Sequence, residues 1–122
     1  MKTTLLSLAT VSAMTLSMAA GAECIYPRIV TQIPDGSTAT QEEIVTAMNA
    51  VKKYNQEINA YLNCLEMESE TQIAALGEAT PEQIKQIKGI QMAKHNAAVD
   101  ELEAYANRFN TQLKAFKAKN PG

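Results

Sequence analysis

The sequence predicts an all-α protein: a long, antiparallel, coiled-coil-like two-helix hairpin with an extended N-terminal arm that one disulfide pins in place. Three observations predict this fold. Two segments of similar length repeat apolar residues with a seven-residue period. Only a few residues connect them, and short connections make consecutive helices antiparallel. The stretch before the first segment contains two prolines and a cysteine and has no helical period.

Residues 1–22 have the features of a secretory signal peptide. A single lysine, Lys2, precedes an apolar stretch without acidic residues, which ends in the small-x-small pattern Ala20-Gly21-Ala22. A membrane anchor is the alternative, but the apolar stretch is too short and too rich in Ser and Thr to span about 30 Å of hydrocarbon. We therefore expect cleavage after about Ala22, a periplasmic location, and no integral membrane segment in the mature chain.

Composition limits the remaining residues, 23–122, to one small domain with few classes of partner. The whole chain has 11 Lys and Arg against 13 Asp and Glu, a net charge of −2. A mildly acidic chain with mixed charges disfavours nucleic acid and anionic membrane surfaces as partners. Aromatic residues make up 5% of the chain and Trp is absent, so we expect a thin core.

Cys24 and Cys64 are the two cysteines of the chain. In an exported protein an even pair predicts a disulfide, and two cysteines allow one intramolecular pairing. An intermolecular bridge and two free thiols are the alternatives. Lipidation of Cys24 is disfavoured because Glu23, rather than a small residue, precedes it.

The first helix is predicted over residues 40–76. TQEE at residues 40–43 is a capping box, in which the side chains of Thr40 and Glu43 each accept a hydrogen bond from the other residue's N–H. Gly77 is a natural left-handed end of the helix. The a and d positions of the repeat hold Ile44, Met48, Val51, Ile58, Leu62, Leu65 and Leu76, and the polar residues Asn55, Ser69 and Gln72 fall on the same seam.

The second helix is predicted over residues 81–117, after a connection of residues 77–80. In TPEQ, Thr80 is the cap, Pro81 the first helical residue, and Gln83 completes a second capping box. Its apolar seam comprises Ile84, Ile87, Ala98, Leu102, Tyr105, Phe109, Leu113 and Phe116. Gly89 costs the helix about 1 kcal/mol relative to Ala, so we expect a close neighbour or a slight bend there. The hairpin is predicted to extend to residue 119, with residues 120–122 as a tail.

Charges along the two helices are consistent with this pairing. Opposite charges are expected to meet at both ends, where Glu42 and Glu43 lie beside residues 114–117 and where Glu66 and Glu70 lie near Lys88 and Lys94. A two-helix hairpin covers each seam on one side only. Either the arm or self-association into a four-helix bundle would cover the other side.

Residues 23–39 are predicted to form an extended arm and a turn. In IPDG, Pro34 fixes φ, Asp35 bonds its own backbone, and Gly36 relaxes the exit. An extended chain from Cys24 to Pro34 spans about 33 Å, and a helix from Cys64 back to Thr40 spans about 36 Å. An arm pinned at Cys64 would therefore run antiparallel along the first helix.

The first helix has a second stripe that could receive this arm. We expect Ile25, Ile29 and Ile33 to lie on that stripe. It comprises Ala47, Ala50, Tyr54, Tyr61 and Cys64. The bridge would close a 41-residue loop, which stabilises the fold by up to about 4 kcal/mol in the chain-entropy account.

His95 is the only histidine, and it falls on the seam of the second helix. We expect a buried or half-buried side chain bonded to a backbone carbonyl or a tyrosine, with metal binding as the weaker interpretation. Copper(I) favours thiolate, thioether and imidazole ligands. Side chains of these types lie at similar heights in the hairpin at Cys64, Met67, Met92 and His95. Their side chains are not expected to converge, so no metal or other cofactor is predicted.

Motifs of enzymes are absent from the sequence. It contains no C-x-x-C, C-x-x-C-H, G-x-S-x-G or H-E-x-x-H motif and no phosphate-binding glycine loop. The acidic residues are spread at helical spacing, as on a solvated face. We therefore predict no catalytic residue.

An ordered set of short motifs resembles a group of small secreted proteobacterial proteins of unassigned function. The motifs are C-x-x-P from Cys24, IPDG before a capped helix, YLNCLE from Tyr61, HNAA from His95 and RFNTQLKAF from Arg108. The resemblance covers most of residues 23–122. It implies a Gram-negative, periplasmic setting, and it adds no catalytic residue and no substrate.

Together these observations predict a non-enzymatic periplasmic protein that binds or scaffolds a protein partner of the cell envelope, or pairs with a second copy of itself. The alternative is a carrier of a small ligand or metal ion that uses the polar gaps of the seam at Asn55 and His95. An enzyme is the third and least favoured interpretation.

Overall fold

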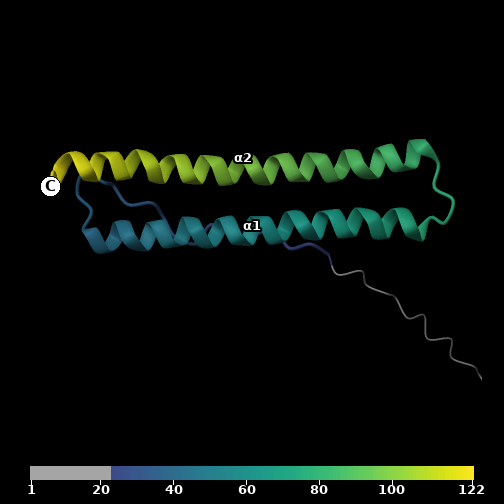
Figure 1. Cartoon of the computed structure of the whole chain (residues 1–122), viewed down its shortest axis with the longest axis horizontal. Coiled ribbons are helices and arrows are strands. Elements are labelled where there is room, and N and C mark those ends of the chain that lie inside the picture. Colours follow the sequence, from purple (N-terminus) through teal and green to yellow (C-terminus); the bar gives the residue numbers. More distant parts are fainter. Residues whose placement is uncertain (1–22) are drawn as a thin grey trace, which may run out of the picture.

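The computed structural model describes residues 23–122, so the predicted signal peptide lies outside the described residues. Two long helices, α1 (Gln41–Ala75) and α2 (Pro81–Lys119), lie side by side and antiparallel (Figure 1). The extended arm precedes α1, and a disulfide joins Cys24 to Cys64. Residues 23–122 contain no strand. The predicted fold class, including the pinned arm, is confirmed.

Both helices begin at the capping boxes that the sequence indicates. At α1 the Thr40 N–H donates to Glu43 Oε2 (2.8 Å) and the Glu43 N–H donates to Thr40 Oγ1 (3.2 Å). At α2 the Thr80 N–H donates to Gln83 Oε1 (2.9 Å), and the Gln83 N–H donates to Thr80 Oγ1 (3.2 Å). Pro81 follows the cap, where its missing N–H costs nothing.

The helices end within two residues of the expected positions. Leu76 caps α1, and Gly77 follows with a φ of 67°, the left-handed conformation that favours glycine. The second helix continues to Lys119, two residues beyond the expected end at 117. There the N–H and Nδ2 of Asn120 both donate to the carbonyl of Phe116, at 3.0 and 2.9 Å.

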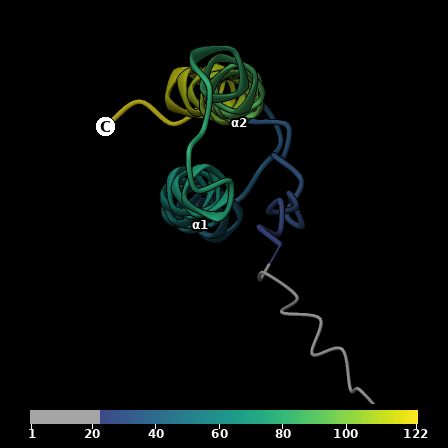
Figure 2. The ribbon, with the colours of Figure 1, turned by 90° about the vertical axis from the view of Figure 1, so that its right-hand side faces the viewer.

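The arm runs antiparallel to α1, and the end-on view shows it beside both helices rather than α1 alone (Figure 2). Three of its groups reach α2. Tyr26 Oη donates to Glu101 Oε2 at 2.5 Å, the Thr31 carbonyl accepts from Tyr105 Oη at 2.8 Å, and the Gly36 N–H donates to Gln112 Oε1 at 2.8 Å. The sequence left open whether the arm covers the hairpin seam or only flanks it, and these contacts show that the arm packs against both helices.

The turn at Pro34-Asp35-Gly36 forms as expected, but Gly36 has a different role. Asp35 Oδ1 accepts from the N–H of Ser37 (2.9 Å), and the Asp35 carbonyl accepts from the N–H of Ala39 (2.8 Å). Gly36 does not have a positive φ. A Cβ placed there would meet the backbone of α2, with the Gln112 carbonyl carbon at 2.7 Å and the Phe116 nitrogen at 2.9 Å. Gly36 is required for this close approach, not for freedom at the turn.

The buried apolar side chains form two adjoining clusters in the part of the hairpin that the arm covers. The first contains Tyr54, Ile58, Tyr61, Leu65, Ala98 and Tyr105, and the second contains Ile44, Ala47 and Phe109. Ile33 of the arm packs against both clusters. The core is thin, as the composition indicates, and the arm supplies a third layer to it.

The buried face of α1 combines the predicted seam with the predicted second stripe. The seam contributes Ile44, Ile58, Leu65 and Ser69, and the stripe contributes Ala47, Tyr54 and Tyr61. Three positions expected on the seam are exposed instead: Asn55, Gln72 and Leu76. The arm lies on one flank of the seam, so burial extends toward the arm side.

Ile25 also differs from the prediction, because its side chain is 87% exposed. From Pro27 onward the arm alternates half-buried odd residues with exposed even ones, so Ile29 and Ile33 face the core. Cys24 turns inward to its disulfide. Two consecutive outward residues, Ile25 and Tyr26, separate Cys24 from Pro27, and the even spacing of the isoleucines does not extend to Ile25.

The expected charge pairing between the helices is not formed as direct ion pairs. Within residues 23–122 the single ion pair closer than 4.0 Å is Lys53–Glu57, at 3.7 Å along α1. Solvated pairs of this kind contribute at most about 1 kcal/mol, which is too little to hold two long side chains together. Gly89 has no neighbour within 4 Å of a built Cβ, so the close neighbour proposed for it is absent. Neither helix has a stretch that is long and apolar enough to cross a membrane.

Candidate functional site

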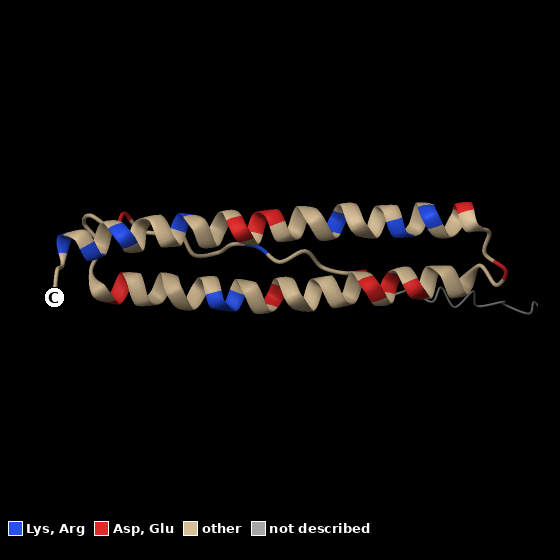
Figure 3. Ribbon diagram, turned by 45° about the horizontal axis from the view of Figure 1, so that its top comes forward, with Lys and Arg blue, Asp and Glu red and all other residues tan. Residues whose placement is uncertain are grey.

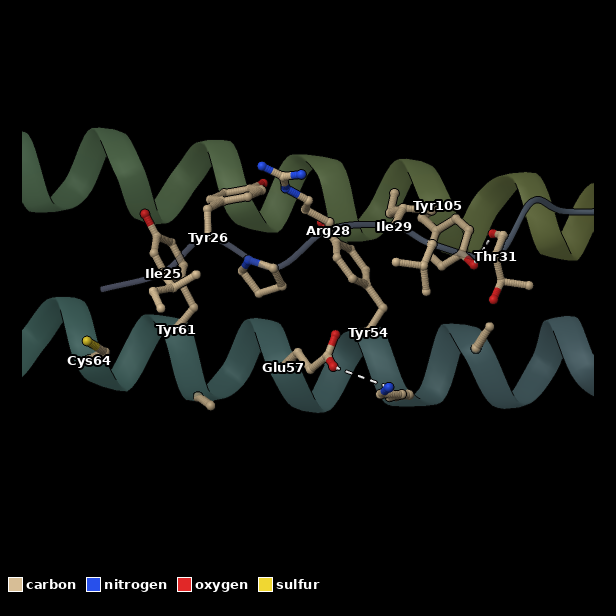
Figure 4. Close-up of a pocket in the computed structure, with 15 residues that line it drawn as sticks. Ile25, Tyr26, Arg28, Ile29, Thr31, Tyr54, Glu57, Tyr61, Cys64 and Tyr105 are labelled. Carbon is tan, nitrogen blue, oxygen red and sulfur yellow. Dashed lines mark hydrogen bonds and ion pairs between the residues drawn. The ribbon is translucent and has the colours of Figure 1, made fainter. Parts of the chain in front are cut away.

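A groove of about 660 Å³ lies between the arm and α1 (Figure 4). One wall is the arm itself, residues 25–31, and the other wall is the arm-facing side of α1. The residues contributed by the helices are Ala50, Lys53, Tyr54, Glu57, Ala60, Tyr61, Cys64 and Tyr105. We take this groove as one of two candidate sites.

The arm that forms one wall has a largely unpaired main chain. Between residues 24 and 34, no backbone N–H donates a hydrogen bond, and the Thr31 carbonyl is the only backbone acceptor in use. Pro27 and Pro34 have no backbone N–H to donate, and the segment forms neither a helix nor a paired strand. The groove is therefore bordered by backbone groups that still have hydrogen-bonding capacity.

Tyrosines form the inner side of the groove and hold the arm. The rings of Tyr26 and Tyr61 meet edge to face at 5.1 Å, and those of Tyr54 and Tyr105 do so at 5.4 Å. The first contact joins the arm to α1, and the second joins α1 to α2. The Tyr54 hydroxyl is buried and has no hydrogen-bond partner, which is uncommon for a buried polar atom.

The environment of these phenols keeps them neutral. Burial raises the pKa of Tyr26 well above its usual value, and the hydrogen bond to Glu101 adds to the shift. Burial also raises the pKa of Tyr54 and of Tyr105. Neutral phenols in contact with one another are hydrogen-bonding and packing groups, and nothing in this arrangement activates one of them as a nucleophile or base.

The rim of the groove is charged. Lys53 and Glu57 form their ion pair on the α1 side, and Arg28 stands exposed on the arm side. Two cations against one carboxylate give the rim a small positive balance. The interior is apolar and aromatic, and its floor includes the small residues Ala50 and Ala60.

The residues of the expected small-ligand site do not form a cavity with one another. Asn55 is exposed. His95 is half-buried, and its Nδ1 is buried without the carbonyl or tyrosine partner that we expected. Neither residue lines any of the three described pockets.

The residues considered for copper(I) are also separated. Cys64 is bonded to Cys24. Met67 and Met92 are 68% and 58% exposed. Among the described residues no cluster of three or more His, Cys, Asp or Glu side chains has the geometry to hold a metal ion.

The second candidate site is the loop-end half of the hairpin, which we define as residues 66–97. The arm does not reach it, and Ser69 is its one buried residue. Ser69 Oγ donates to Gln91 Oε1 at 2.8 Å. This polar contact joins α1 to α2 in the loop-end half, whereas apolar clusters join them in the other half. Five large apolar side chains of this half are exposed: Met67, Leu76, Ile84, Ile90 and Met92.

Sequence reasoning placed the arm and the caps but missed the groove. The signal that could have indicated it is the period-two pattern of the arm after Pro27, which leaves Arg28 and Val30 outward. Comparison of the chain with protein-family models, curated proteins and solved structures finds no match. The resemblance to small secreted proteobacterial proteins stays a prediction, and the function is argued from the geometry.

Proposed function

We propose that the protein is a non-enzymatic, exported protein-interaction module whose loop-end half packs against a helical surface of a partner protein. One observation carries the proposal. Five of the nine exposed large apolar side chains of the described residues lie in this half, and no apolar side chain in it is buried. Exposed apolar surface of this kind is typical of binding sites.

The packing of the loop-end half indicates a helical partner. Ile73 and Ile87 lie on the inner faces of α1 and α2 but are only half-buried. In the other half the arm completes the core. A pair of helices with an incomplete seam becomes a stable bundle when one or two further helices complete it, so a helical surface supplies what the arm does not.

Charge would orient that partner. Within the loop-end half, α1 carries Glu66, Glu68 and Glu70 and no basic residue, whereas α2 carries Lys85, Lys88 and Lys94 (Figure 3). A partner helix with basic residues fits α1, and one with acidic residues fits α2. A second copy of the hairpin would satisfy both requirements and is one of the partners that the experiment below distinguishes.

The periplasmic setting is part of the proposal. The Cys24–Cys64 disulfide supports it, because such bridges persist in oxidising compartments and are rare in the cytosol. The features of residues 1–22 support export by the general secretory route.

Site-specific photo-crosslinking in the periplasm tests the proposal. A crosslinking amino acid is placed at Met67 or Ile90 in the loop-end half, and at Val45 as the matched control. Val45 is 43% exposed on α1, in the half that the arm covers. We expect adducts at the first two positions and none at Val45, and we expect Ile90→Gln to reduce the adduct formed through Met67.

Mass spectrometry of the adduct and the solution mass of the purified protein then identify the partner as another protein or a second copy. A monomeric protein without adducts at Met67 and Ile90, or with equal adducts at Val45, contradicts the proposal.

The alternative, a carrier of a small ligand, has one observation in its favour, the buried and unpartnered Nδ1 of His95. Asn55, its expected companion, is exposed. The geometry therefore supports this function less well than protein binding. A ligand retained in native mass spectra of the wild type and lost from His95→Leu would favour it.

A further inference from the structure

We infer that the groove between the arm and α1 binds an extended segment of another polypeptide, which adds as a strand to the free edge of the arm. The groove lies in the arm-covered half of the hairpin, so its occupation is independent of the helix packing proposed for residues 66–97. Four observations point to this kind of occupant. They are the unpaired backbone of the arm, the exposed apolar side chains beside the groove, the charges at its rim, and the poor fit of a second copy's arm.

The backbone of the arm requires an occupant with backbone groups of its own. The arm is extended and has a row of free donors and acceptors between residues 24 and 34, with the Thr31 carbonyl as the one exception. Helices such as α1 have no free backbone groups along their length. Strand addition matches an exposed, unpaired backbone with another, and pockets for alternate side chains supply the specificity.

The side chains beside the arm suit an extended chain with apolar residues at alternate positions. Ile25 and Val30 are 87% and 81% exposed, although both are large apolar residues next to the groove. Ala50 and Ala60 form a shallow floor opposite them. A strand presents every second side chain to the same face, so one face of the occupant would cover these residues.

The rim favours one acidic side chain in the occupant. Among the lining residues Glu57 is the one carboxylate and pairs with Lys53 at 3.7 Å, whereas the Arg28 guanidinium lies on the α2 side of the arm (Figure 4). An acid on the solvent face of the bound strand would balance the extra cation, with a small effect on affinity because the rim is solvated.

The arm of a second copy is a poor occupant. Antiparallel pairing of two copies of residues 25–31 about their centre would set Arg28 opposite Arg28 and Pro27 opposite Ile29. Pro27 lacks the N–H that the ladder needs, and two arginines side by side repel. We therefore assign the groove to a different polypeptide.

Hydrogen exchange combined with peptide binding tests the inference on the purified protein. The probe is the peptide Val-Thr-Val-Glu-Val, acetylated and amidated at its ends. In the free protein the amides of residues 28–32 should exchange rapidly, because none of them donates a hydrogen bond. On binding, we expect slower exchange at alternate amides of this segment, the pattern of one strand edge.

Two controls separate strand addition from general apolar contact. A peptide with the same side chains but N-methylated at alternate amides cannot form the ladder, and the loss of two hydrogen bonds should weaken binding about tenfold. Ala60→Trp fills the groove and should abolish binding. Ala104→Trp, at an exposed position of α2 away from the groove, should bind like the wild type.

The outcomes decide the matter. Absence of binding at millimolar peptide, binding without protection of arm amides, or equal binding of the methylated peptide each overturns the inference. Self-association that Ala60→Trp abolishes overturns the choice of another polypeptide. If Ala60→Trp does not fold, the methylated peptide still decides, and none of these results depends on Met67 or Ile90.

Discussion

Two glycines of this molecule, Gly36 and Gly89, differ in what an added side chain would meet. Gly36 lies against the backbone of α2 at Gln112 and Phe116, where a side chain has no room. Gly89 lies in the middle of α2 with open space around it. The same residue type is therefore structurally required at the first position and only a weak point of the helix at the second.

The matched substitutions Gly36→Ala and Gly89→Ala should have opposite effects on the free energy of unfolding. Gly36→Ala forces the turn away from α2 and should destabilise the protein by about 1–3 kcal/mol, the usual cost of an overpacked site. Gly89→Ala should stabilise it by up to about 1 kcal/mol, because Ala has the higher helix propensity. Denaturant unfolding followed by circular dichroism measures both. Equal effects of the two substitutions would show that the close approach at Gly36 is not retained in solution.

At the scale of elements, the arm is attached to α1 by a covalent bond, the Cys24–Cys64 disulfide. It contributes Ile29 and Ile33 to the first core cluster and Ile33 to both, but its backbone makes few hydrogen bonds. Its attachment depends on the disulfide at one end and on the turn around Gly36 at the other.

Cys64→Ser should therefore lower the free energy of unfolding by up to about 4 kcal/mol, since the bridge closes a loop with a sequence separation of 40. For a domain of this size 1 kcal/mol corresponds to about 4–8 °C, so the thermal midpoint should fall by up to about 16–32 °C. Cys24→Ser and the double variant should fall by the same amount, because all three lose the same bond. A midpoint that matches the wild type in all three variants would mean that the bridge is not structural.

The sequence predicts the elements better than their contacts, for physical reasons. Capping boxes at Thr40 and Thr80 are local, so the ends of the helices could be located from a few neighbouring residues. The buried face of α1 is not local. Ile58 of the predicted seam and Tyr54 of the second stripe are both buried, because the arm covers the flank that α2 leaves open.

The groove could not be predicted because it belongs to neither element alone. Ala50 and Ala60 are ordinary helix residues until the arm lies opposite them. Their role depends on the distance between the arm and α1, to which the Tyr26–Tyr61 contact contributes. The loop-end half was closer to prediction, since the sequence already indicated a seam covered on one side only.

At the scale of the whole molecule, the hairpin has a packed half and an open half. Within residues 23–122 the buried apolar side chains lie in two ranges, residues 44–65 and 98–109. Beyond them the helices are held by half-buried residues such as Ile73 and Ile87 and by the Ser69–Gln91 hydrogen bond. Local stability is expected to follow the buried apolar contacts.

Native-state hydrogen exchange should reveal this gradient. Amides of residues 70–75 and 84–90 should exchange through openings at least about 1 kcal/mol lower in free energy than those of residues 54–65 and 98–109. Binding of a partner to the loop-end half should remove the difference. Uniform protection along both helices in the free protein would show that the open half is as stable as the packed half.

The position of Cys24 has a mechanical consequence. The bridge joins the beginning of the described arm to the middle of α1 at Cys64, and the arm then runs back to the start of that helix. Tension applied to the chain ahead of Cys24 would pass through the sulfur atoms into the centre of α1 and would not load the arm's own contacts. The arm would therefore not detach from the helices at its Cys24 end. Detachment would have to begin at the turn near Gly36, where no covalent bond to α2 holds the chain.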